Sequence, residues 1–182
     1  MELEDIKKID TKCMYKTYDD WPNIASESYN KKYNKIDVND IDHIVFAGMG
    51  GSGSVGDTIS AILSKKNIHV TNVKGYVLPN TVDSKTLVIA TSVSGNTAEI
   101  LTILKDIKKT NAKVSGFSSG GLFEKYCRDN QIFYQKIPMI HSPRASFTNF
   151  LYAILNILEP VLPIQKNDIQ DSITSLDKIK KN

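Results

Sequence analysis

The chain has 182 residues, of which 41% are hydrophobic and 24% charged, and its formal net charge is +3. This length fits one α/β domain with extensions, and the apolar content is sufficient for one sizeable core. Arg128 and Arg144 are the only arginines among 23 basic residues, and the lysines are scattered among acidic residues. Such scattering is typical of a solvated surface, so we expect no nucleic-acid partner.

Cysteine usage and hydropathy indicate the expected compartment. Cys13 and Cys127 form no spaced framework, and no Cys/His cluster has the spacing of a zinc site, so we expect no metal. The first residues lack an apolar signal core. The longest apolar stretch, 150–164, is interrupted by Pro160 and Pro163 and is too short to span a bilayer. We therefore expect a cytoplasmic protein without membrane contact.

Residues 1–40 are polar and lysine-rich, with apolar positions at helical spacing. This pattern predicts an N-terminal helical extension of one or two helices, interrupted near Pro22 and lying on the outside of the domain.

Residues 41–160 alternate between short apolar runs and amphipathic segments, which predicts the main domain. The continuous apolar runs at 44–47 and 86–91 are typical of strands buried on both faces. Further strands are predicted at 69–73, 114–117 and 131–137, and helices at 52–65, 97–109, 122–128 and 147–158. The alternation predicts a three-layer α/β/α sandwich around a parallel sheet of about five strands, with 86–91 at or near its centre.

Residues 161–182 predict a C-terminal amphipathic helix. Ile169, Ile173, Leu176 and Ile179 recur at three- and four-residue spacing and form one apolar stripe. The stripe requires a partner surface, in this chain or in another. Together with the apolar segment 147–158, it leads us to expect self-association.

A glycine loop, residues 48–53 (Gly-Met-Gly-Gly-Ser-Gly), follows the first core strand and opens a helix. Glycine lets the backbone approach a ligand, and a helix N-terminus offers unpaired N–H groups to an anion. The spacing also matches a dinucleotide fingerprint, but that site requires an acidic residue about 20 positions later, and 58–82 contains none. A tight turn without a ligand is the remaining alternative.

A second polar loop follows the strand at 86–91. Ser92, Ser94 and Thr97 place three hydroxyl groups at a helix start, which is where a phosphate monoester dianion finds short donors and the positive end of a helix dipole. We call these three residues the hydroxyl cradle. The alternative is a capping box formed by Asn96 and Glu99, which would leave the three hydroxyl groups unexplained.

The two loops together resemble the sugar-isomerase (SIS) fold. The segment 143–147 (Pro-Arg-Ala-Ser-Phe) narrows the resemblance, over about residues 20–160, to the N-terminal lobe of the archaeal-type bifunctional phosphoglucose/phosphomannose isomerases. The resemblance implies an aldose–ketose isomerase acting on glucose 6-phosphate, mannose 6-phosphate and fructose 6-phosphate, for which we expect no cofactor. It implies that substrate and phosphate are held by Gly50, Gly51, Ser52, Ser92, Ser94 and Thr97.

The resemblance also implies that Arg144 stabilises an enediolate. Isomerisation between an aldose and a ketose passes through an enediol, whose developing oxyanion requires a fixed positive donor. A guanidinium group does not deprotonate and suits this task better than an ammonium group.

The chain departs from that family in carrying one lobe, whereas the glutamate and histidine that transfer protons in the family belong to a second lobe. Glu99 and Glu124 fall inside predicted helices as surface charges. His43 and His69 begin strands, and only His141 is close in sequence to the arginine.

Three interpretations stay open. The chain is the first half of an isomerase, or a small SIS protein that forms an active site across a homodimer, or a phosphosugar-sensing module without chemistry. The expected partners are a phosphosugar and either a second copy or a second SIS lobe.

Overall fold

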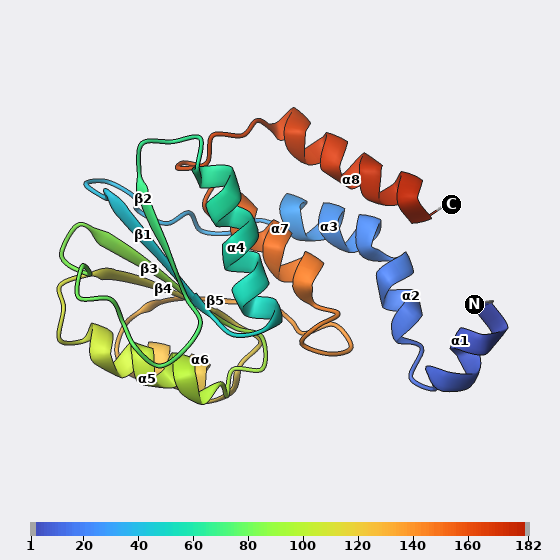
Figure 1. Ribbon diagram of the computed structural model, residues 1–182, viewed down its shortest axis with the longest axis horizontal. Helices are drawn as coiled ribbons and strands as arrows, with labels where there is room; N and C mark the ends of the chain where they lie inside the picture. The colour runs from blue at the N-terminus through green and yellow to red at the C-terminus, as the bar shows by residue number, and fades with distance from the viewer. Residues whose placement is uncertain (1–2, 181–182) are drawn as a thin grey trace.

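Five parallel strands form one sheet in the order β2-β1-β3-β4-β5 (Figure 1). The structure, a computed structural model, describes residues 3–180. β3 is the central strand, and all seven of its residues are buried. The strands are β1 (His43–Gly48), β2 (His69–Val73), β3 (Thr86–Ser92), β4 (Lys113–Ser118) and β5 (Phe133–Lys136). The predicted parallel α/β sheet is confirmed, with 86–91 at its centre.

Helices cover both faces of the sheet and complete the three layers. α4 (Gly51–Leu63) and α7 (Phe147–Ile157) pack on one face, and α5 (Ala98–Ile107) and α6 (Gly121–Asp129) pack on the other. α3 (Trp21–Asn30) lies against α7, and α8 (Lys166–Lys180) lies against α3. Figure 1 shows α3 and α8 side by side on the outer side of the α4/α7 layer.

The alternation of side chains along the strands divides the core in two. Ile44 and Phe46 of β1 contribute to the cluster under α4 and α7, while Val45 and Ala47 contribute to the cluster under α5 and α6. Because successive strand residues point to opposite faces, a strand apolar at every position can only be buried on both sides. This is why the continuous apolar runs predicted the central strands correctly.

The N-terminal region differs from the prediction. It contains three helices, α1 (Leu3–Ile9), α2 (Met14–Asp19) and α3, instead of one or two. The helical region is interrupted near Pro22 as predicted, because α2 ends at Asp19 and α3 begins at Trp21. Pro22 lies in the first turn of α3, where its missing N–H costs no hydrogen bond. α1 and α2 bury no residues, but Ile24 and Ala25 of α3 are buried. α3 therefore lies on the outer side of the α4/α7 layer (Figure 1), as expected, and buries one face against α7.

The two apolar segments that suggested self-association are largely covered within the chain. α7 is buried between the sheet and α3, and Ile169 and Ile173 of α8 join the same core cluster. Ile179, in contrast, remains 73% exposed. These segments therefore give little reason to expect a second copy, and self-association stays a prediction.

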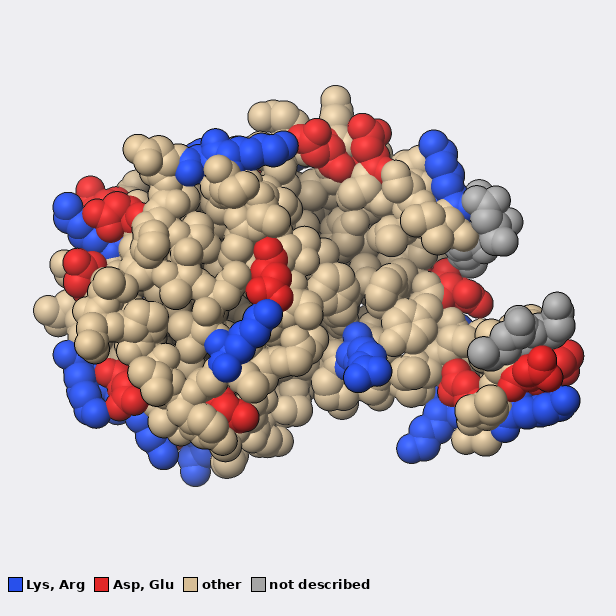
Figure 2. Space-filling view, in the orientation of Figure 1, with Lys and Arg blue, Asp and Glu red and all other residues tan. Residues whose placement is uncertain are grey.

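The described surface carries mixed charges. On the face shown in Figure 2, basic and acidic side chains are interspersed over most elements. Among residues 3–180 no helix is both long and apolar enough to cross a bilayer.

Candidate functional site

The two predicted loops leave the sheet side by side. From β1 the chain crosses to β2 on one side and then returns to β3 on the other, so the loops after β1 and β3 diverge at the carboxyl edge of the sheet. This divergence is the topological switch point, at which ligands bind in open parallel sheets. The glycine loop follows β1 and the hydroxyl cradle follows β3.

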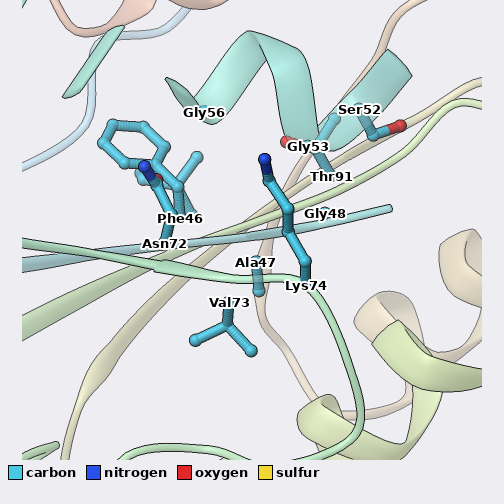
Figure 3. Close-up of a pocket in the computed structure, with 11 residues that line it drawn as sticks. Phe46, Ala47, Gly48, Ser52, Gly53, Gly56, Asn72, Val73, Lys74 and Thr91 are labelled. Atoms are coloured by element: carbon cyan, nitrogen blue, oxygen red, sulfur yellow. The ribbon is translucent and has the colours of Figure 1, made fainter. Parts of the chain in front are cut away.

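The glycine loop turns directly into α4. Gly50 has φ 53°, which favours glycine, and α4 begins at Gly51. Figure 3 shows Gly48, Ser52 and Gly53 at the end of β1, with the side chain of Lys74 running past Gly53. The Lys74 ammonium group is paired with Asp57 of α4 at 2.6 Å. This ion pair joins α4 to the segment after β2, and the N–H groups of Ser52 and Gly53 bond to the Met49 carbonyl oxygen of the loop at 3.1 and 3.3 Å.

One hydrogen bond joins the glycine loop to the cradle. The Ser52 hydroxyl oxygen accepts a hydrogen bond from the backbone N–H of Val93 at 3.2 Å, and both residues are buried. The two motifs, separated by about 40 positions in the sequence, therefore form a single site.

The cradle hydroxyl groups bond to one another and to their own loop. Ser92 Oγ and Thr97 Oγ1 lie 2.7 Å apart, and the Gly95 N–H donates to Ser92 Oγ at 3.2 Å. Ser94 is exposed, and its hydroxyl oxygen accepts from the Asn96 N–H at 3.3 Å. Hydroxyl hydrogens rotate freely, so this arrangement can redirect its donors towards an anion.

The alternative capping box is wrong. Thr97, not Asn96, is the N-cap of α5, and it makes no side-chain capping bond. Asn96 instead accepts a hydrogen bond from the Leu122 N–H at 3.1 Å and so caps α6. The start of α5 therefore has no side-chain cap among the described residues, and an uncapped helix N-terminus offers its N–H groups to an anion.

Arg144 lies beside the glycine loop. It is exposed in the segment between β5 and α7, and a Cβ atom on Gly51 would lie 3.9 Å from the Arg144 Cα atom. The two residues line a hollow of about 400 Å³ together with Gly50 and Ser54. The structure therefore brings the predicted arginine to the predicted loop, although more than 90 positions separate them in the sequence.

Two of the three groups considered as proton-transfer bases, Glu124 and His141, have partners elsewhere. Glu124 pairs with Arg128 and with Lys136, each at 3.0 Å. His141 Nε2 donates to the Lys12 carbonyl oxygen at 3.1 Å. Glu99 lies in the first turn of α5 and is partly buried.

His43 and Cys127 also lack access to the site. His43 begins β1, at the opposite edge of the sheet, where burial and the neighbouring His69 lower its pKa. Burial raises the pKa of the Cys127 thiol to about 12, so this residue remains a protonated core side chain.

Sequence reasoning missed three aromatic residues at the site. Tyr18, Trp21 and Phe147 line the same hollow as Arg144. The polar character of residues 1–40 predicts helices outside the domain for the segment that contains Tyr18 and Trp21. The available signal was Trp21 itself, the single tryptophan of the chain, placed in a lysine-rich stretch.

Similarity to known structures agrees with this architecture. No protein-family model matches the chain. The structure of tagatose-6-phosphate ketose/aldose isomerase from Escherichia coli has a TM-score of 0.67 at 14% identity, covering 92% of this chain and 52% of that protein. The structure of glucosamine-6-phosphate deaminase from Thermotoga maritima has a TM-score of 0.70 at 18% identity, covering 91% of this chain and 53% of that protein. The chain therefore has the SIS fold.

Similarity to curated sequences is more specific. The bifunctional phosphoglucose/phosphomannose isomerase of Caldicellulosiruptor bescii is 34% identical over 152 residues, which are 80% of this chain and 44% of that protein. Other relatives of the same name are 28% to 39% identical. The chain is a homologue of the bifunctional phosphoglucose/phosphomannose isomerases, and it spans less than half the length of the C. bescii relative.

Proposed function

We propose that the chain is the phosphosugar-binding part of an aldose–ketose isomerase. The substrates would be glucose 6-phosphate and mannose 6-phosphate, each interconverted with fructose 6-phosphate. The observation that supports this most directly is the bond from the Val93 N–H to Ser52, which unites the two loops next to Arg144. The homology to isomerases of this substrate class supports the choice of reaction.

In this proposal the hydroxyl cradle binds the phosphate group. Ser92, Ser94 and Thr97 rotate their hydroxyl hydrogens towards the phosphate oxygens, and the Ser92–Thr97 hydrogen bond is exchanged for bonds to the anion. The N-terminal end of α5 adds the positive end of its dipole. A phosphate monoester carries close to two negative charges at neutral pH, so each of these bonds is charge-assisted.

The sugar then extends along the glycine loop towards Arg144. Gly50 and Gly51 place backbone N–H groups at the start of α4, and Ser52 holds this start against the cradle loop. Arg144 lies next to Gly51, where its guanidinium group can stabilise the negative charge that develops on the enediolate oxygen.

A phosphosugar-binding module without chemistry is the second candidate function. The observation in its favour is that Glu124 is paired with two cations and His141 bonds to Lys12, so neither is free to act as a base. If the chain is instead one lobe of a split active site, a second lobe or a second copy supplies the base. The length of the relatives, about twice that of this chain, favours the second lobe.

Titration calorimetry with glucose 6-phosphate and with glucose tests the proposed binding site. Because the phosphate is the group that the cradle recognises, we expect binding of glucose 6-phosphate and no measurable binding of glucose. Equal affinity for the two sugars would show that the cradle does not bind phosphate.

A further inference from the structure

The hollow beside Arg144 has two chemically different sides. Gly50, Gly51, Ser54 and Arg144 supply polar groups on one side, and the aromatic residues Tyr18, Trp21 and Phe147 form the other. We call these three aromatic residues the aromatic wall. A volume of about 400 Å³ is within the usual range for a small-molecule site.

The aromatic wall is positioned by one hydrogen bond and by ring contacts. The Trp21 indole N–H donates to the Ala145 carbonyl oxygen at 3.3 Å, next to Arg144 in the sequence. The Tyr18 and Trp21 rings meet edge to face with centroids 4.9 Å apart, and the Phe147 ring lies 6.2 Å from Trp21. All three side chains remain partly exposed. Because the indole N–H is already bonded, what Trp21 offers to the hollow is apolar ring surface.

An apolar wall facing polar donors matches the shape of a sugar. Hydroxyl groups project from the edges of a sugar, while its faces carry C–H groups that gain free energy when they leave water for an aromatic surface. A bare phosphate ion has no such face and gains nothing from the wall. We propose that Tyr18 and Trp21, supported by Phe147, bind the carbon skeleton of the phosphosugar and so select sugar phosphates over other phosphates. This inference rests on the proposed function, because it places the substrate between the cradle and Arg144.

The assignment also gives the N-terminal segment a role. Tyr18 belongs to α2 and Trp21 begins α3, and these helices reach the site through the aromatic wall and the bond to Ala145. The segment before the sheet therefore completes the binding site of the domain that follows it.

Trp21 makes the test possible in the unmodified protein. It is the single tryptophan, so intrinsic tryptophan fluorescence reports on the aromatic wall alone. We expect fructose 6-phosphate and glucose 6-phosphate to change the emission with the same affinity that calorimetry measures. Inorganic phosphate, which would occupy only the cradle, should leave the emission unchanged. Calorimetric binding of a sugar phosphate without a fluorescence change would overturn the inference while leaving the proposed function intact.

Variants provide an independent test. Trp21→Ala and Tyr18→Ala should each weaken fructose 6-phosphate binding by about tenfold, from the loss of buried apolar area, and should leave the affinity for inorganic phosphate unchanged. Trp21→Phe should restore part of the loss. Tyr76→Ala, at a tyrosine that is 54% exposed in the loop after β2, is the matched control and should have no effect. Equal weakening of both ligands would indicate a structural role and overturn the inference, whereas absence of sugar phosphate binding in the wild type would overturn the proposed function itself.

Discussion

The backbone of Gly95 packs against the carbonyl group of Gly120, so that a Cβ atom on Gly95 would overlap the Gly120 oxygen. Gly95 lies inside the cradle loop at φ 70°, and its own carbonyl oxygen accepts the Phe123 N–H at 2.9 Å. The cradle loop and the start of α6 are therefore fitted together with no room for a side chain. The shape of the cradle depends on this contact.

Replacement of Gly95 by alanine should destabilise the protein and the cradle together. The left-handed backbone costs a non-glycine residue about 1–2 kcal/mol, and the clash with Gly120 adds to this cost. We expect denaturant unfolding to show a loss of at least about 2 kcal/mol, with weaker binding of glucose 6-phosphate. Gly75→Ala is the control, because its Cβ atom would meet no atom within 4 Å and it is not among the positive-φ residues. If both variants had wild-type stability, the contact would not matter.

Ser94→Ala should weaken phosphosugar binding with little effect on folding. Ser94 is exposed and accepts only a long bond from Asn96, so its removal leaves the loop largely intact. A hydrogen bond to a charged group contributes about 1.5–3 kcal/mol, which corresponds to about 10- to 150-fold in affinity. Calorimetry with glucose 6-phosphate measures the change. Ser175→Ala, at an exposed serine on α8, should bind as the wild type does. A wild-type affinity in the Ser94 variant would remove this residue from the site.

Arg144→Gln should discriminate between a substrate and an analogue of the enediolate. An aldonic acid phosphate carries a carboxylate where the enediolate develops its charge, so the guanidinium group should favour it over glucose 6-phosphate. We expect the variant to lose about 10- to 150-fold of its affinity for the aldonate phosphate and much less for glucose 6-phosphate. Arg128→Gln is the control, since Arg128 is exposed and pairs with Glu124. Equal losses for both ligands would assign Arg144 to phosphate or general binding.

His43 should make the folded protein less stable below about pH 6.5. Its pKa in the folded protein is lowered, first by burial and then by His69, while Asp42 and Asp83 oppose the shift. The unfolded chain therefore binds the proton more readily than the folded protein. The stability that neutral His43 contributes is complete above the pKa of the unfolded state, and it is lost as the pH falls below that value. One such group contributes at most about 1.4 kcal/mol per pH unit. Unfolding measured between pH 7 and 5 should show a shallower decline of the free energy of unfolding in His43→Gln than in the wild type, and parallel declines in the two proteins would contradict this prediction.

Most of the sheet could be predicted because its strands are buried on both faces. Residues 69–73 form β2 as predicted, and 86–91 form all but the last residue of β3. The N-terminal helices were harder to place, because a partly exposed helix such as α3 shows only two or three apolar residues to the core. The hydrogen bond of Asn96 could not be predicted, because its side-chain oxygen accepts from the Leu122 N–H in α6, a helix that begins 25 residues later. The approach of Arg144 to Gly51 likewise depends on how the segment after β5 folds back over α4.

The isolated chain should bind phosphosugar but show little or no isomerase activity. The described residues supply the cradle, the glycine loop and Arg144, while Glu124 and His141 are held by other partners. General acid–base catalysis contributes about 10²–10⁴-fold, so turnover should fall well below that of a full-length relative.

Conversion of fructose 6-phosphate to glucose 6-phosphate or mannose 6-phosphate by the chain alone is the assay for this prediction. It should be repeated after addition of a second-lobe protein from the same source, with Arg144→Gln as the negative control. Activity that requires the second lobe would establish a split active site, because the base would then reach the enediolate from outside this chain. Robust turnover by the chain alone would contradict the prediction. Sedimentation would then show whether the active species is a dimer, and variants of Glu99, Glu124 and His141 would identify which residue reaches a neighbour's Arg144.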